Sequence, residues 1–158
     1  MVLETIRQSL REHPFLDGLR PAHVERLALL ATEVEFHRDQ VIFNVGEESS
    51  HFYLILAGRV ALDVPSPART VRIQVVGEGD ELGWSSLLTP SHKQFKAVCV
   101  NRTTALAFDG KQLLETCERD HEFGFFLMSR ILRTVAERLQ ATRIQLADLY
   151  SPAGAKAS

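Results

Sequence analysis

A glycine-rich segment in the middle of the chain carries the residues best suited to bind a small molecule. It runs over residues 77–88, and its second part consists of Gly83, Trp84, Ser85, Ser86 and Leu87. Such a run can start a short helix, whose first backbone amides bind anions with help from serine hydroxyls. Lys93 and Lys96 follow and add positive charge. The spacing indicates an anion site, although the same glycines also suit a turn without a ligand.

The histidines and cysteines do not form the groups that metal sites and catalytic centres require. The six histidines are scattered, with no His-x-His or His-x-x-x-His pair: His13, His23, His37, His51, His92 and His121. A jelly-roll metalloenzyme needs closely spaced histidines and a carboxylate. Cys99 lies in an apolar strand pattern, which is typical of a buried side chain rather than a nucleophile. We therefore predict no enzymatic activity, no catalytic residue and no metal site.

Length and composition restrict the class of protein. The chain has 158 residues, 45% of them hydrophobic, which suits one globular domain and excludes a disordered chain. Its 18 basic and 20 acidic residues argue against a broad basic surface for nucleic acid. No apolar run approaches the roughly 20 residues of a membrane span, and Glu4 interrupts any signal peptide. These features predict a cytoplasmic protein with free thiols and no membrane contact.

The hydrophobic pattern divides the chain into zones. Residues 1–34 have helical spacing in two segments, the first ended by Pro14 and the second started by Pro21. Residues 35–108 show short apolar runs separated by glycine turns, which predicts an antiparallel roll or barrel. Residues 109–150 are helical again, and residues 151–158 are expected to form a disordered tail. Because no helical pattern separates the strands, a parallel sheet is excluded.

Two pairs of runs within the strand-rich zone indicate hairpins. The first pair alternates apolar with polar or small residues, at Val60, Leu62 and Val64 and again at Val71, Ile73 and Val75. Residues 65–68 between these runs can turn but cannot continue a ladder, because they contain two prolines. Residues 97–100 and 105–108 flank residues 101–104 in a similar way.

The last zone begins with two helix caps and continues as one long helix. Asp109 and Gln112 have the spacing of a capping box, and Asp120 can cap the final helix. That helix carries apolar residues at spacings of three and four, with Thr142 as the one polar member: Phe125, Met128, Leu132, Val135, Leu139, Thr142, Leu146 and Leu149. The stripe can pack on its own domain, but its length and regularity favour a parallel two-helix dimer seam.

The order of these elements resembles the cyclic nucleotide-binding domain of the catabolite activator (cyclic-AMP receptor) protein superfamily. Residues 41–48 followed by residues 52–60 are similar to the early strands of that family. Gly79 and Asp80, with Gly83, resemble the entry to its phosphate-binding cassette, here residues 79–97. Residues 138–142 resemble its central helix. The resemblance implies a mainly β, α+β fold: an antiparallel double-stranded β-helix (jelly-roll-like β-roll) with N-terminal helices and a long C-terminal dimerisation helix.

The resemblance also implies roles for single residues. Gly83 matches the cassette glycine, and Thr142 matches the residue that touches the purine from the dimer partner, with Arg143 beside it. Trp84 stands where the family has its ribose-binding glutamate, and Lys93 or Gln94 where it has its phosphate-binding arginine. Each lost charged hydrogen bond weakens binding by about 1.5–3 kcal/mol, so the two departures predict weaker binding of cyclic AMP than the family pattern implies. The cassette therefore accepts another anion, or Trp84 fills it.

These observations lead to two functional hypotheses. The first is a non-enzymatic regulatory module that senses a cyclic nucleotide (cAMP or cGMP) or a related anionic molecule and signals through its dimer helix to a partner protein. The second is a dimeric adaptor with a degenerate, empty pocket. Too few residues follow Leu149 for the DNA-binding domain of the transcription factors in this family, so the resemblance is to its stand-alone members. Haem binding stays open, because no histidine stands out as an axial ligand.

Overall fold

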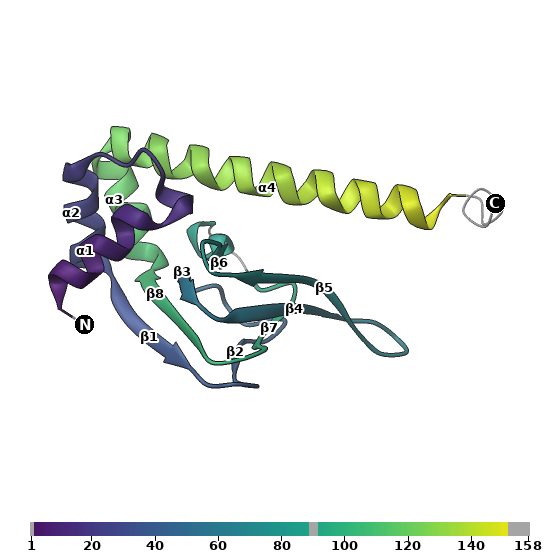
Figure 1. Ribbon diagram of the computed structural model, residues 1–158. Helices are drawn as coiled ribbons and strands as arrows, with labels where there is room; N and C mark the ends of the chain where they lie inside the picture. Colours follow the sequence, from purple (N-terminus) through teal and green to yellow (C-terminus); the bar gives the residue numbers. More distant parts are fainter. Residues whose placement is uncertain (1, 89–91, 152–158) are drawn as a thin grey trace.

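The structure, a computed structural model, describes residues 2–88 and 92–151 (Figure 1). Helices α1 (Leu3–Glu12), η1 (Pro14–Leu16) and α2 (Pro21–Leu30) come first, and α3 (Gly110–Arg119) and α4 (His121–Leu149) come last. Between them lie β1 (Thr32–Phe36), β2 (Val41–Phe43), β3 (His51–Ala57), β4 (Arg59–Pro65), β5 (Thr70–Gly77), β6 (Glu81–Leu82), the 3-10 helix η2 (Trp84–Leu87), β7 (Lys96–Cys99) and β8 (Thr103–Asp109).

The strands form two four-stranded sheets within the described residues. One sheet has the order β1-β8-β3-β6 and the other has the order β2-β7-β4-β5. Every neighbouring pair is antiparallel. Since the chain alternates between the sheets, strands distant in sequence become neighbours. This topology confirms the predicted jelly-roll-like β-roll with N-terminal helices and a long C-terminal helix.

One predicted hairpin is confirmed and the other is wrong. Strands β4 and β5 pair directly, with Val60 opposite Val76 and Val64 opposite Val71. Strands β7 and β8 do not pair with each other: β7 lies between β2 and β4, whereas β8 lies between β1 and β3. The chain crosses from one sheet to the other between them. Apolar alternation shows that a strand is half-buried, but it does not identify the neighbouring strand.

Two apolar clusters hold the molecule together. The first joins the helices to the sheet that contains β3 and β8, and its fully buried members include Phe52, Phe108, Phe123 and Leu127. The second lies between the two sheets and includes Ile55, Val60 and Leu82. Helix α4 contributes to the first cluster only with its initial turns. The roll is therefore anchored to the beginning of α4.

The predicted aspartate caps of the last two helices are present, although among the described residues no hydrogen bond from the Gln112 side chain completes the capping box. The Asp109 carboxylate accepts from the backbone N–H of Gln112 at 3.1 Å, and the Asp120 carboxylate accepts from that of Phe123 at 3.1 Å. Helix α4 has 29 residues, about 44 Å at 1.5 Å per residue, and it extends past the roll (Figure 1). Apart from Ser151, the tail predicted for residues 151–158 lies outside the described residues.

Candidate ligand-binding site

Gly83 turns the chain from β6 into η2, as the glycine-rich segment suggests. Its backbone has a φ of +86°, which side-chain-bearing residues rarely adopt. A Cβ at this position would also lie 2.5 Å from the carbonyl oxygen of His51 on β3. Because both the conformation and the space exclude a side chain, glycine fixes how residues 84–87 leave the sheet.

A cavity of about 500 Å³ opens beside this turn, and we call it the cassette cavity. Its lining consists of Gly83, Trp84, Ser85, Leu88, His92, Lys93, Gln94, Phe95 and Arg138. The structure thus brings together five predicted ligand-binding residues: Gly83, Trp84, Ser85, Lys93 and Gln94. Ser86 and Leu87 are buried and do not line the cavity. Leu87 instead belongs to the apolar cluster under the helices.

Lys93 is a buried cation at the wall of the cassette cavity. Its backbone is held by hydrogen bonds with Gly46 and Glu47, and its side chain is only 5% exposed. The ammonium donates to Ser85 Oγ at 3.1 Å and lies 4.3 Å from the centre of the Phe43 ring. Burial lowers the pKa of Lys93 to about 8, partly offset by the charge of Glu47. Within residues 2–88 and 92–151, no carboxylate forms an ion pair with Lys93.

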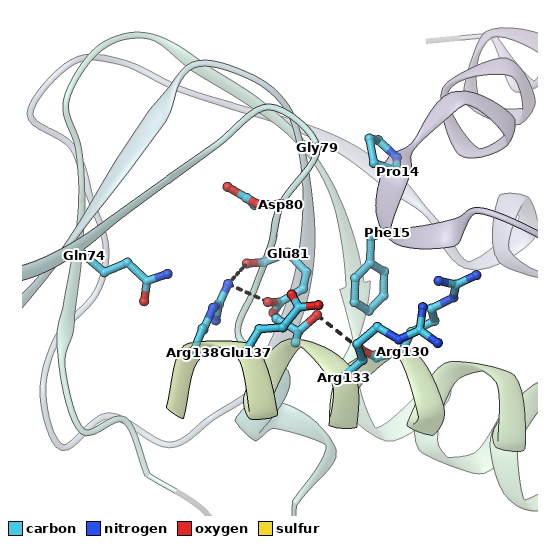
Figure 2. Close-up of a pocket in the computed structure, with 11 residues that line it drawn as sticks. Pro14, Phe15, Gln74, Gly79, Asp80, Glu81, Arg130, Arg133, Glu137 and Arg138 are labelled. Carbon is cyan, nitrogen blue, oxygen red and sulfur yellow. Dashed lines mark hydrogen bonds and ion pairs between the residues drawn. The ribbon is translucent and has the colours of Figure 1, made fainter. Parts of the chain in front are cut away.

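A second cavity, of about 360 Å³, lies on the other side of Arg138 and contains a buried carboxylate (Figure 2). We call it the Glu81 cavity. Glu81 on β6 is 1% exposed, and its Oε1 lies 2.6 Å from Nη2 of Arg138 on α4. The same nitrogen donates to the carbonyl oxygen of Glu81 at 3.2 Å. Desolvation raises the pKa of Glu81 to about 7, because the nearby Arg138 charge offsets it only in part and Asp80 adds to it.

The sequence alone does not predict this ion pair. Arg138 lies in residues 138–142, which resemble the central helix of the family, and Glu81 lies within the glycine-rich residues 77–88. One feature of β6 could have indicated the pair. Glu81 and Leu82 are successive residues of this strand, so their side chains point to opposite faces, and both residues are buried. A charged residue buried on such a strand requires a partner from a neighbouring element.

Thr142 and Arg143 lie on the exposed part of α4, away from the cassette cavity. The Thr142 hydroxyl donates to the carbonyl oxygen of Arg138 at 2.9 Å, one turn back on the same helix. Neither residue lines the cassette cavity of its own chain. Their predicted contact with a ligand in a second copy stays a prediction.

Other kinds of site are not visible in the described part of the chain. No three His, Cys, Asp or Glu side chains gather there in a way that could hold a metal ion. Among the helices of residues 2–88 and 92–151, none combines the length and the apolar character of a membrane span.

The comparison with protein families agrees with the fold. The sequence profile of the cyclic nucleotide-binding domain matches residues 33–120, more than half of the chain. The chain belongs to this family. The matched range contains the β-roll except Thr32, the first residue of β1, and the lining of the cassette cavity except Arg138.

Individual relatives resemble this chain in sequence or in fold. A CRP-like cAMP-activated global transcriptional regulator of Mycobacterium tuberculosis is 26% identical over 133 residues, which are 84% of this chain and 58% of the regulator. A cyclic nucleotide-binding domain from Methylobacillus flagellatus has a TM-score of 0.80 at 17% identity, covering 95% of this chain and 85% of that one. Thermus thermophilus catabolite activator protein has a TM-score of 0.72 at 23% identity, and the match covers 86% of this chain and 62% of that one.

Proposed function

We propose that the protein is a non-enzymatic regulatory module that binds a cyclic nucleotide or a related anionic molecule in the cassette cavity. Binding changes the position of α4, which pairs with α4 of a second copy and passes the signal to a partner protein in the cytoplasm. The family supports the regulatory role, since its profile covers the β-roll. The transcriptional regulator from M. tuberculosis is described as activated by cAMP, which makes a cyclic nucleotide the first ligand to test.

The observation that carries this proposal is the buried ammonium of Lys93. A buried cation that lacks a carboxylate partner is unfavourable, because burial removes its hydration. Glu47 offsets the burial of Lys93 only in part and forms no ion pair with it within the described residues, so an anion in the cassette cavity would supply a direct counter-charge next to Lys93 and Ser85. Arg138 lines the same cavity and adds a second cation. The site therefore suits a phosphate or carboxylate better than a neutral molecule.

Trp84 favours the ligand-binding hypothesis over the empty adaptor. The adaptor hypothesis expects Trp84 to be buried and to fill the pocket. Trp84 is instead half-buried and lines an open cavity. Its indole can stack on a planar ring, but it cannot accept a hydrogen bond from a ribose hydroxyl as a carboxylate does. We therefore expect weaker binding of cyclic AMP than in a protein with a glutamate there.

The exposed stripe on α4 supports the dimer. Phe125, Leu132, Leu139, Leu146 and Leu149 are all exposed. A row of apolar residues at this spacing is stable in water when a second helix covers it. In such a dimer, Thr142 of one copy can approach the ligand of the other. Direct DNA binding is not part of the proposal.

Calorimetric titration with cyclic AMP and cyclic GMP tests the proposed function. Micromolar to submillimolar binding by the wild type that Lys93→Met abolishes supports it, since Lys93 then faces the bound anion. Lys96→Met is the matched control, because Lys96 lies on β7 outside the lining of the cassette cavity. No heat with either nucleotide up to millimolar concentration rejects a cyclic nucleotide as the ligand and favours the adaptor.

A further inference from the structure

Arg138 lies between the cassette cavity and the Glu81 cavity, and its guanidinium can pair with an anion in either one. Of the described residues that line the cassette cavity and the Glu81 cavity, Arg138 is the one that lines both. Its guanidinium contacts Glu81 in the structure, and Figure 2 shows it directed toward the carboxylate on β6. A ligand anion in the cassette cavity would offer the same guanidinium a second partner. One cation would then face two anions on opposite sides.

Glu81 depends on Arg138 for its charge. Neither carboxylate oxygen of Glu81 accepts a hydrogen bond of good geometry from the described residues, so the ion pair is its main electrostatic support. A buried carboxylate that loses its cation is costly to keep ionised, and it takes up a proton instead. The Glu81 side chain is almost completely buried, so water cannot replace the guanidinium without local rearrangement.

We propose that Glu81 and Arg138 form a proton-linked latch: an anion in the cassette cavity draws Arg138 away from Glu81, and the freed carboxyl binds a proton. The latch rests on the proposed function for its ligand, but not for its protonation step. Because Arg138 belongs to α4, opening the latch releases the polar contact between this helix and β6. Ligand and proton favour the same state, so each increases the affinity for the other.

This linkage has a defined direction and limit. Binding coupled to proton uptake is tighter at low pH, and one proton changes the affinity by at most tenfold per pH unit. The pKa of Glu81 near 7 puts the change in the neutral range. Lys93 responds in the same direction, since an anion stabilises its charged form, but its pKa near 8 puts that response at higher pH.

The other charged groups around Glu81 do not replace Arg138. On its own strand segment, Asp80 accepts from the backbone N–H of Gly77 at 2.8 Å and raises the pKa of Glu81. His13, before η1, faces Asp80 and the carbonyl oxygen of Ile55, and burial lowers the pKa of its ring.

Helix α4 adds three further charged side chains to the Glu81 cavity. Arg130 donates to the carbonyl oxygen of Asp17 and stacks on Phe126, whereas Arg133 and Glu137 line the cavity without an ion pair to Glu81 among the described residues. The remaining β5 residue in the lining, Gln74, is neutral. Arg138 is therefore the cation whose movement Glu81 senses.

Nuclear magnetic resonance tests the latch without any ligand. We would follow the carbon-13 signal of the Glu81 carboxyl and the nitrogen-15 signal of the Arg138 side chain from pH 5 to pH 9. Both signals should shift with one midpoint near 7. Glu81→Gln should remove the Arg138 transition, and the matched control Glu137→Gln should keep it. An Arg138 signal that does not follow Glu81 overturns the latch.

Calorimetry with cyclic AMP as the probe tests the link to the ligand. At pH 7, the wild type should take up about half a proton on binding, measured from the heats in bis-Tris and Tris buffers, whose cationic forms do not compete for the anion site, and Glu81→Gln should take up much less. Binding without uptake that depends on Glu81 overturns the latch and leaves the proposed function in place. Absence of heat, together with a shared pH transition, rejects the nucleotide and supports the latch.

Discussion

The two halves of α4 have opposite environments although they belong to one continuous helix. In residues 121–133, Phe123 and Leu127 are fully buried, and a Cβ on Gly124 would lie 2.7 Å from the carbonyl oxygen of Cys117 on α3. In residues 134–149, the residues from 141 onward are all exposed, and Arg138 supplies the ion pair to the β-roll. The first half is fixed by packing, whereas the second half is more exposed and contacts β6 through the ion pair of Arg138 with Glu81.

This difference indicates how a signal can leave the β-roll. Close packing at the start of α4 holds its axis, because interiors resist small displacements. An ion pair, by contrast, is sensitive to protons and to competing anions. In the proposed mechanism, a change at Arg138 would act on the half of α4 that is expected to pair with a second copy.

The largest expected effect comes from a substitution in the packed half of α4, residues 121–133. Phe123→Ala removes a ring that is 0% exposed and should lower the free energy of unfolding by about 3–5 kcal/mol, measured by urea denaturation. Ser129→Ala, at an exposed position on the same half of α4 and outside the predicted seam, is the control and should change the free energy of unfolding by less than about 0.5 kcal/mol. Equal effects of the two substitutions would contradict the close packing of this half of α4.

The next prediction concerns the dimer seam on α4, which should be disrupted without unfolding the protein. The double substitution Leu132→Asp with Leu139→Asp places charges in the predicted seam, so the dimer should dissociate to monomers in sedimentation experiments at micromolar concentration. Circular dichroism should still show a folded roll. Ile144→Ser, on another face of α4, should leave the dimer intact. A dimer that persists in the double variant would exclude the seam as the interface.

A smaller effect concerns the ion pair and depends on pH. The pKa of Glu81 rises from 4.5 to about 7 on folding, so between these values the folded state binds more protons than the unfolded chain. Wild-type stability should therefore fall as the pH rises from 5 to 7 and then level off, a loss of at most about 3 kcal/mol. Glu81→Gln has no carboxyl that titrates at this position, so its stability should not fall in this way. The difference in stability between the variant and the wild type should therefore shift in favour of the variant from pH 5 to pH 7, as measured by thermal denaturation. A constant difference between pH 5 and pH 8 would mean that Glu81 stays ionised.

The smallest effect tests the contact across the dimer. Thr142 is exposed, so Thr142→Ala should change the free energy of unfolding by less than about 0.5 kcal/mol. If its hydroxyl bonds to the ligand of the second copy, the same change should weaken binding of cyclic AMP by about two- to tenfold in calorimetry. Unchanged affinity would remove Thr142 from the site and leave the cavity residues of the same chain.

Much of the fold could be predicted because it depends on local patterns. The spacing of Leu3, Ile6 and Leu10 predicts α1, and the carboxylates of Asp109 and Asp120 cap the helices that they precede. The β4–β5 hairpin follows from two alternating runs joined by a short turn. The partners of β7 and β8 could not be predicted in this way, since the pairing of distant strands depends on how the two sheets close over a common core.

The candidate site divides along the same line. The sequence by itself determined the glycine turn at Gly83 and the nearby Lys93, because backbone conformation and charge are properties of single residues. It also determined the apolar stripe of α4, because a helix repeats every 3.6 residues. The tertiary structure alone decided that Lys93 is buried against Ser85 and Phe43, and that Arg138 meets Glu81, 57 residues earlier in the chain. Burial and charge pairing depend on which distant surfaces come together, and they set the pKa of Lys93 and the pKa of Glu81.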